Sequence, residues 1–527
     1  MKLFFLLIIL VSAAFLRFYK LSEYPIHLGH DEVTQLYDAI SVAETGKDIY
    51  GNPYPFIFRS VNDFKPPFYT YATALLYPIF GWREITVRIT GAFFGTLLVL
   101  GVYYFSKEFL KKEGIALTAA ILTAISPFEI FYSRKSFENQ TGVFLMFVGF
   151  AFLLSYIRRK KVKFFYLGAL SLGISAYIYF AQAVLVPILI FVFFLIFWKK
   201  LRPFKIWPFV FFLAIIAPLF YMILTNSDVR NRASAVSIRQ DPRLGEKLEG
   251  KSGVYRTTTV LSYAVVRYFK QFDPKYLFFE GLNMTEGKRD VGVLFPAQIP
   301  FLLVGAYLMI KEKLLLKERL FIFVWILVGM IPSGLTFENF SPHRALMTFT
   351  MLNVVTSFGI FWFYRRFGQI ALFLLVILFG LNFIFFVKRY TVNYPIERSE
   401  ALHYPYRDVA LYAWENYGNY EKIVFDPKFG EFAPWIGTGA HYYLAFYGKY
   451  QPERFQKEFT IGDQSKRETK FGKFSIRAVF WPEDKSLKDT LIIASVWSLP
   501  VNVKDEAKII KTFYFKTTAP AFYAIKL

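Results

Sequence analysis

The chain has 527 residues, of which 55% are hydrophobic and 20% aromatic, and its formal net charge is +23. A soluble globular protein carries fewer apolar and more charged residues, so this composition excludes that class and indicates a membrane protein. The basic residues form short clusters between apolar runs, which is typical of topology signals and argues against nucleic acid as a partner. Cysteine is absent, which excludes disulfides, thiolate metal sites and a cysteine nucleophile.

About eleven apolar stretches are long enough, at roughly 17 to 25 residues, to cross a bilayer as helices. They cover residues 3–19, 85–106, 115–132, 141–157, 163–180, 182–198, 205–224, 293–310, 318–336, 344–363 and 369–387. The first resembles a signal peptide, but no small-residue cleavage site follows it, so we interpret it as a retained span. The predicted fold class is a polytopic α-helical membrane protein.

Basic residues gather in alternate loops of this scheme. The clusters are Lys107 with Lys111 and Lys112, Arg158 to Lys163, Lys199 to Lys205, Lys311 to Arg319, and Arg365 with Arg366. Because such clusters remain in the cytoplasm, these loops and the N-terminus are predicted to lie inside. The aromatic amphipathic stretch Pro67 to Gly81 would reverse every loop if it were a span, so we predict an interfacial helix there.

The remaining loops are then predicted to face outward, at residues 20–84, 133–140, 225–292 and 337–343 and in the tail from 388. In the long loop 225–292, four arginines are candidates to close over a lipid phosphate, although a solvated loop is the alternative: Arg230, Arg232, Arg239 and Arg243. No internal repeat is evident, which weakens a transporter interpretation.

We predict two domains, a transmembrane catalytic domain over residues 1–389 and an extracytoplasmic C-terminal domain over residues 390–527. The second region has more charge, glycine and proline than the first. Short alternating runs there predict strands at Lys422 to Phe425, Ser475 to Trp481 and Leu491 to Val496. A small α/β or mostly β domain is expected.

The first outer loop carries two groups of candidate site residues. His27-Leu-Gly-His30-Asp31-Glu32 contains an acidic pair close to the first span, and Lys65 precedes Pro66 and Pro67. The structural alternative for the acids is the first turn of a helix, where they suit the macrodipole. For Lys65 the alternative is an anchor to lipid headgroups.

Two further outer loops add cations and a carboxylate. Arg134 and Glu138 lie in one loop, while His343 and Arg344 lie at the outer end of the tenth span. A salt-bridged loop and a structural histidine are the alternatives. Since the topology places all these residues on the same side as Asp31, we predict that carboxylates and cations converge above the bilayer.

Transfer of a sugar from a polyprenyl phosphate needs both kinds of group. When the glycosidic bond breaks, a phosphodiester monoanion becomes a phosphomonoester dianion, so fixed cations stabilise the transition state more than the ground state. Lys65, Arg134 and Arg344 are the candidates for binding this phosphate. The acceptor hydroxyl must lose a proton, for which a carboxylate can act as general base, and Asp31 is the candidate.

These motifs resemble those of the GT-C superfamily, in the branch that contains protein O-mannosyltransferases and the 4-amino-arabinose lipid A transferases. The resemblance covers about residues 1 to 390 and rests on the acidic pair, Lys65-Pro66-Pro67, and the Ser-Arg and Glu-Asn pairs around Arg134 and Glu138. It implies a GT-C fold, Asp31 as catalytic base, and Glu32 positioning the acceptor or donor. It also implies that Lys65 holds the donor phosphate.

The chain departs from parts of this branch. Protein O-mannosyltransferases usually have His-Pro-Pro where this chain has Lys65, and their eukaryotic β-trefoil insertion is not found, so the lipid A transferases are the nearer resemblance. The Trp-Trp-Asp motif of oligosaccharyltransferases is also absent, which argues against transfer of an assembled oligosaccharide.

The predicted function is inverting transfer of a monosaccharide from a polyprenyl-phosphate donor to a lipid, glycan or protein acceptor. The active site is predicted at the outer face of the cytoplasmic membrane, with Glu138, His343 and His30 as further candidates. No metal ligand is assigned, and the resemblance leaves a divalent cation, Mg²⁺ or Mn²⁺, open. The alternatives are a lipid-linked glycan ligase, a lipid or glycan transporter, and an inactive receptor.

Overall fold

The computed structural model describes residues 2–60, 64–201, 206–225, 234, 236–284, 290–312, 314–338, 340–429, 435–436, 439–463 and 467–527. The chain forms two compact units. The first comprises residues 1–19 and 89–390, and the second comprises residues 20–88 and 391–527. We call the first the helical unit and the second the α/β unit.

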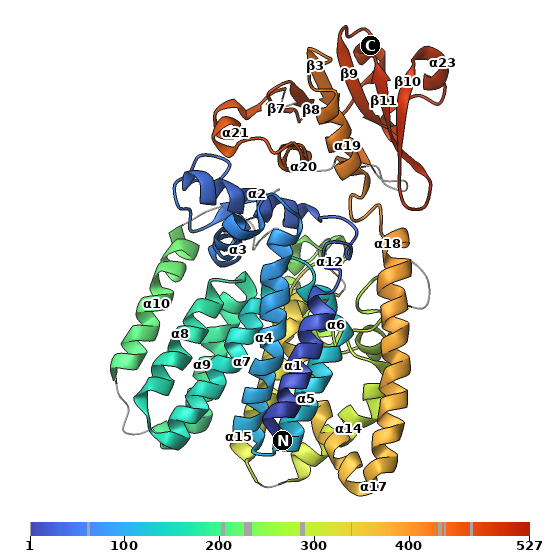
Figure 1. The fold of residues 1–527 in the computed structure, drawn as a ribbon. Coiled ribbons are helices and arrows are strands. Elements are labelled where there is room, and N and C mark those ends of the chain that lie inside the picture. The colour runs from blue at the N-terminus through green and yellow to red at the C-terminus, as the bar shows by residue number, and fades with distance from the viewer. Residues whose placement is uncertain are drawn as a thin grey trace. The chain divides into compact units, whose positions relative to one another are not determined.

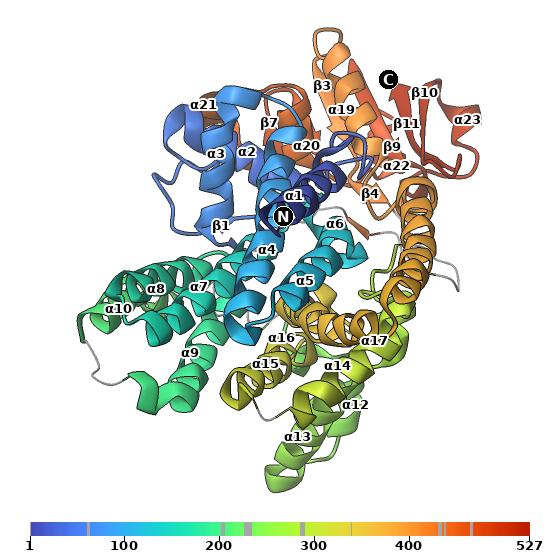
Figure 2. The same cartoon turned by 60° about the horizontal axis from the view of Figure 1, so that its bottom comes forward.

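The helical unit is built almost entirely from α-helices, many of which run up and down in a bundle (Figures 1 and 2). Its helices are α1 (Lys2–Phe18), α4 (Ile85–Leu110, which begins in the α/β unit), α5 (Glu113–Ile125), α6 (Pro127–Ser133), α7 (Asn139–Arg159), α8 (Val162–Ala176), α9 (Phe180–Leu201), α10 (Ile206–Thr225), α12 (Pro242–Leu248), α13 (Gly253–Lys270), α14 (Ile299–Lys311), α15 (Leu316–Gly329), α16 (Ile331–Gly334) and α17 (Leu346–Lys388). Shorter turns are η1 (Ile238–Gln240), η2 (Tyr276–Glu280), η3 (Pro296–Gln298) and η4 (Pro342–Ala345), and η5 (Arg389–Asn393) leads out of the unit.

Each of the predicted spans coincides with one or more of these helices, which confirms a mostly helical fold with several apolar helices. Among the described residues, 4 helices are long and apolar enough to cross a membrane: Ile85–Leu110, Asn139–Arg159, Phe180–Leu201 and the helical run Pro342–Glu397. The pair α5 and α6, bent by 55°, would make a fifth. Helices such as α8 and α14, of 15 and 13 residues, are shorter than the roughly 20 residues that a span needs. The count of eleven spans and their orientation stay predictions.

The two last predicted spans form one element, α17, which is interrupted at Gly368. This glycine has φ of 58° and ψ of −129°, so helical geometry is lost at that residue. A positive φ strains a residue with a side chain, and glycine adopts it freely. The loop predicted around Arg365 and Arg366 is therefore reduced to a sharp break in the helix.

Glycines let two helices of this unit approach closely. A Cβ atom on Gly359 of α17 would lie 2.0 Å from the carbonyl oxygen of Phe301 in α14. A Cβ on Gly305 of α14 would lie 2.2 Å from the carbonyl oxygen of Val355 in α17. The two backbones are thus in direct contact, the packing that small residues allow between membrane helices.

The α/β unit combines the first outer loop with the C-terminal region. Its helices are α2 (His30–Thr45), α3 (Pro67–Phe80), α18 (Tyr394–Glu397), α19 (Pro405–Glu415), α20 (Ala440–Tyr447), α21 (Pro452–Glu458), α22 (Trp481–Asp484) and α23 (Val503–Glu506). Its strands are β1 (Phe58–Arg59), β2 (Phe64–Lys65), β3 (Lys422–Phe425), β4 (Lys428–Phe429), β5 (Trp435–Ile436), β6 (Thr460–Ile461), β7 (Thr469–Phe471), β8 (Phe474–Ile476), β9 (Thr490–Ser495), β10 (Ile509–Tyr514) and β11 (Pro520–Lys526), and η6 covers Val496–Ser498.

Seven of these strands form one mixed sheet in the order β10-β11-β9-β3-β8-β7-β6, which dominates the C-terminal region (Figure 1). The strand β3 runs parallel to β8 and β9, and the outer strands pair antiparallel. The strands predicted at 422–425 and 491–496 are present as β3 and β9, whereas the one predicted at 475–481 is wrong beyond Ile476, because β8 ends there and Trp481 begins α22. The C-terminal region was expected to be either α/β or mostly β, and it is α/β.

A single apolar core joins the first outer loop to the C-terminal region. Leu36 and Tyr37 of α2 are buried in the same cluster as Tyr442 of α20, Phe455 of α21 and Phe522 of β11. The Tyr37 hydroxyl also donates to the Tyr450 carbonyl at 2.8 Å. The helix that carries the acidic pair is therefore held in place by residues more than 400 positions later in the chain.

Candidate active site

The acidic pair lies in the first turn of α2. Gly29 precedes the helix in an extended conformation, and its backbone N–H donates to Glu32 Oε2 at 2.8 Å. Asp31 and Glu32 thus stand where the partial positive charge of the helix N-terminus favours carboxylates. This position matches the structural alternative for the pair, and it leaves Asp31 partly exposed, with 33% of its side chain accessible.

Lys65 forms an ion pair with Asp31, the atoms Nζ and Oδ1 lying 2.9 Å apart. Local structure fixes the lysine, because Lys65 lies in β2 opposite Phe58 of β1 and Pro67 begins α3 two residues later. The Lys65 side chain is only 9% exposed. The helix predicted from Pro67 to Gly81 is present as α3, whereas Asn62 and Asp63 of the same motif lie outside the described residues.

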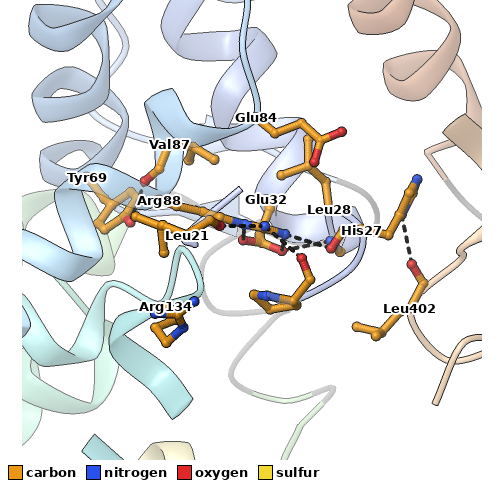
Figure 3. Close-up of polar contacts among 12 residues, drawn as sticks. Leu21, His27, Leu28, Glu32, Tyr69, Glu84, Val87, Arg88, Arg134 and Leu402 are labelled. Carbon is orange, nitrogen blue, oxygen red and sulfur yellow. Dashed lines mark hydrogen bonds and ion pairs between the residues drawn. The ribbon is translucent and has the colours of Figure 1, made fainter. Parts of the chain in front are cut away.

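Glu32 is engaged by a buried arginine that the sequence analysis missed (Figure 3). Arg88 Nε donates to Glu32 Oε1 at 3.1 Å, and the guanidinium also donates to the carbonyls of Leu21, Pro25 and His27 at 2.7 to 3.1 Å. Arg88 is fully buried and Glu32 nearly so. This network fastens the N-terminus of α2 to the start of α4, so Glu32 holds Asp31 in position.

A sequence signal for Arg88 existed. It is an ionisable residue within a predicted apolar span, and such residues need a buried partner. Looking for the partner of Arg88 among Asp31 and Glu32 would have identified its ion pair with Glu32.

A second group that the sequence analysis missed is a buried layer of histidine and tyrosine behind His30. The rings of His30 and His403 lie 5.7 Å apart, and the Tyr443 hydroxyl donates to the Leu28 carbonyl at 2.8 Å. Burial lowers the pKa of His403 well below its ordinary value, so its ring is neutral. His30 Nε2 itself lies 3.7 Å from Asp31 Oδ1. Residue 403 is too distant in sequence for any local pattern to have linked it to Asp31.

Burial also lowers the pKa of His27, to about 3, and this has a consequence for stability. Below about pH 6.5 the unfolded chain binds a proton at this residue while the folded chain does not, so folding becomes less favourable as pH falls. In His27→Asn this dependence is lost. We expect the stability advantage of the wild type over the variant to shrink by about 2 kcal/mol between pH 7.5 and pH 5. Guanidinium unfolding in detergent micelles at both pH values measures it, and a constant difference would contradict it.

The other predicted phosphate ligand of the first half, Arg134, belongs to the helical unit. It follows α6 and is buried, and its guanidinium donates to the carbonyls of Leu16 and Arg17 at 2.9 and 3.1 Å and to the Tyr390 hydroxyl at 3.2 Å. These bonds tie the end of α1 to the bend between α6 and α7. Glu138, also buried, is the residue before α7.

Two loops of the helical unit that are predicted to face outward contact each other. The Asn139 amide donates to the His343 carbonyl, and the rings of Phe137 and His343 lie 5.8 Å apart. Arg344 pairs with Glu338 at 3.2 Å and donates to the Ser341 hydroxyl at 2.9 Å. The convergence of this set with Asp31, Glu32 and Lys65 stays a prediction.

The arginines of the long loop 225–292 are only partly described. Arg243 pairs with Asp241 at 2.9 Å at the start of α12, and Arg239 is exposed in η1. Arg230 and Arg232 lie outside the described residues. The described part of this loop contains the 18-residue helix α13 rather than irregular chain alone.

The acidic pair does not offer a ready site for Mg²⁺ or Mn²⁺. Within the described ranges, no group of three or more histidine, aspartate and glutamate side chains is arranged to hold a metal ion. Lys65 contacts Asp31 and Arg88 contacts Glu32, so a cation already stands beside each carboxylate. The residues present therefore do not fit a divalent cation.

Comparisons with known proteins identify similarity at the level of fold and motif. Residues 64–222 match the family model for dolichyl-phosphate-mannose-protein mannosyltransferase. Comparison with curated proteins finds no match.

Solved structures give likenesses of 13 to 14% identity. ArnT from Cupriavidus metallidurans in the apo state aligns with a TM-score of 0.56 over 98% of this chain and 97% of that one, at 13% identity. The apo oligosaccharyltransferase of Archaeoglobus fulgidus aligns with a TM-score of 0.55 over 85% of this chain, at 14% identity, and the present chain spans 64% of its length. Further structures show the same two proteins bound to undecaprenyl phosphate and to an inhibitory peptide with dolichol-phosphate, respectively.

The family match over residues 64–222 and the structural likenesses agree with the resemblance to the GT-C superfamily. The chain therefore has the GT-C fold of membrane glycosyltransferases, as its sequence predicted.

Proposed function

We propose that this protein transfers a monosaccharide, with inversion, from a polyprenyl-phosphate carrier to an acceptor at the outer face of the cytoplasmic membrane. The observation that carries the proposal is the ion pair between Asp31 and Lys65 at 2.9 Å. It brings a candidate base and a candidate phosphate ligand into contact at a partly exposed position. The side of the membrane rests on the basic loops of the sequence.

Lys65 suits the leaving phosphate. Its ammonium group has three N–H donors, so it can keep one bond to Asp31 and give another to a phosphate oxygen. As the sugar leaves, charge accumulates on that phosphate, and a fixed cation stabilises the charge more in the transition state than in the donor.

Asp31 suits the base. The acceptor hydroxyl attacks the anomeric carbon, the bond from that carbon to the phosphate oxygen breaks, and the hydroxyl proton passes to the Asp31 carboxylate. Glu32 does not compete for this role, because Arg88 and the Gly29 N–H already occupy its oxygens. It acts as a positioning residue.

The similar proteins support a lipid phosphate as the donor carrier. ArnT binds undecaprenyl phosphate, and the Archaeoglobus fulgidus enzyme binds dolichol-phosphate. Both carriers are polyprenyl phosphates, the chemical class to which Lys65 is proposed to bind. The sugar and the acceptor are left open by these likenesses.

Lys65→Ala tests the donor assignment. We expect the variant to lose about 100- to 1,000-fold in transfer rate, as when one preorganised electrostatic group is removed from a transition state. Transfer of radiolabelled sugar from a panel of polyprenyl-phosphate monosaccharides, using purified full-length protein, measures this. Binding of the unlabelled donor should weaken in parallel.

Lys47→Ala is the matched control, because Lys47 is an exposed lysine of the same outer segment. It should transfer sugar at the wild-type rate. If the wild type consumes none of the donors, the glycosyltransferase proposal fails, and a glycan ligase or a transporter takes its place.

Chelation tests the cofactor assignment. Since Lys65 and Arg88 already stand beside the two carboxylates, we expect transfer to continue at an undiminished rate after dialysis against EDTA. Loss of activity that Mg²⁺ or Mn²⁺ restores would contradict this arrangement of charges.

A further inference from the structure

A pocket of about 350 Å³ lies in the helical unit between α5, α14 and α17, which are neighbours in Figures 1 and 2. It is far from the candidate phosphate ligands of the same unit. Arg344 lies just before α17, whereas the pocket lies near Arg365, about 20 residues along that helix. At 1.5 Å per residue this is roughly 30 Å. Within the helical unit the pocket is therefore separate from Arg344.

Three cations line the pocket. They are Lys112 before α5, Lys311 at the end of α14, and Arg365 before the break in α17. The one carboxylate in the lining, Glu312, lies 3.6 Å from Lys112. In the described part of the chain, Lys311 and Arg365 have no carboxylate partner. The pocket thus keeps two unneutralised positive charges.

The rest of the lining is apolar. Its apolar lining residues are the buried Ile115 and Phe358 together with Leu308, Phe361 and Trp362. Trp362 is 43% exposed, and the neighbouring Tyr307 and Ile310 of α14 are 58% and 72% exposed. An apolar surface therefore continues outward from the cations along α14 and α17.

We propose that this pocket binds the headgroup of an anionic diacyl phospholipid, with its acyl chains lying along the exposed apolar surface of α14 and α17. Cations between membrane helices attract phospholipid phosphates, and the apolar surface fits acyl chains but offers nothing to a free phosphate ion. The pocket lies among basic clusters predicted to be cytoplasmic, and anionic lipids concentrate in that leaflet.

Bromine-labelled lipids test the proposal, because bromine quenches tryptophan fluorescence on contact. The full-length protein is placed in phosphatidylcholine nanodiscs that contain increasing fractions of brominated phosphatidylglycerol or brominated phosphatidylcholine. The chain has 9 tryptophans, so the Trp362 signal is taken as the difference between the wild type and Trp362→Phe. Two unneutralised cations should make half-maximal quenching occur at a roughly thirtyfold lower fraction of the anionic lipid.

The charge variant carries Lys112→Gln, Lys311→Gln and Arg365→Gln. The matched control carries Lys111→Gln, Lys317→Gln and Arg366→Gln, which remove the same charge from the same loops but do not line the pocket. The proposal expects the preference for phosphatidylglycerol to disappear in the first variant and to persist in the second.

Three results would overturn the proposal. Equal quenching by both lipids would show ordinary contact with surrounding lipid. A preference that survives the pocket variant would place it elsewhere. Recovery of fluorescence on adding a tenfold smaller amount of undecaprenyl phosphate would identify a carrier site instead. None of these results depends on sugar transfer, so this test and that of the proposed function fail independently.

Discussion

Asp31→Asn is expected to lower the rate of sugar transfer by about 100- to 10,000-fold while donor binding persists, the range by which a positioned general base accelerates a reaction. Asparagine keeps the size of the side chain and can still accept a hydrogen bond from Lys65, but it cannot take the acceptor proton. Single-turnover transfer from bound donor, compared with equilibrium binding of the same donor, separates the two effects.

Glu23→Gln is the control for this loss of charge. Glu23 lies in the same loop 20–84, is largely exposed, and pairs with the exposed Lys20 at 2.9 Å. Its replacement should leave transfer unchanged. Should Asp31→Asn retain the wild-type rate with saturating donor and acceptor, another group is the base.

Arg88→Met is expected to destabilise the α/β unit by about 3 to 5 kcal/mol, because it leaves the buried Glu32 carboxylate without its cation. The carbonyls of Leu21, Pro25 and His27 also lose their donor. Methionine retains much of the volume and length of the arginine stem, so the loss reports charge and hydrogen bonding rather than a cavity. Chemical unfolding in detergent, followed by near-ultraviolet circular dichroism, measures it.

Two further variants make this result specific. Arg83→Met removes an exposed arginine five positions earlier and should change stability little. The double variant Arg88→Met with Glu32→Gln removes the buried charge as well, and it should recover part of the lost stability. A single variant as stable as the wild type would contradict the role of this ion pair.

Local sequence signals predicted the elements that local chemistry determines. The helix expected from Pro67 to Gly81 begins as predicted, because the proline pair fixes its start. It ends one residue early, at Phe80, because Gly81 adopts a positive φ. The strand expected at Lys422 to Phe425 is present as β3, an apolar run bounded by polar residues. Asp31 and Lys65 became candidates because the predicted topology places both in one outward-facing loop and because both belong to motifs that resemble those of the GT-C superfamily.

Other parts depend on packing that no local pattern records. Arg88 was read as part of an apolar span, and only the folded chain shows its bonds to Glu32 and to three carbonyls. His403 lies in a turn, where its own φ is 55°. This turn belongs to the region that the sequence assigned to a separate domain. The number of spans stays a prediction, because apolar runs predict helices well but do not show whether neighbouring runs join into one element, as the last two do in α17 on either side of the break at Gly368.

The core shared by α2 and the C-terminal region imposes an order on biosynthesis. Residues 20–88 leave the ribosome first, but their apolar face meets Tyr442, Phe455 and Phe522 only after more than 300 further residues have been added. At about 5 to 20 residues per second, this delay lasts on the order of 15 s to a minute. During that interval the segment that carries Asp31 and Lys65 lacks its packing partners, and a chain that ends before β11 would still lack Phe522. The segment that carries Asp31 and Lys65 therefore gains its complete apolar core only late in synthesis.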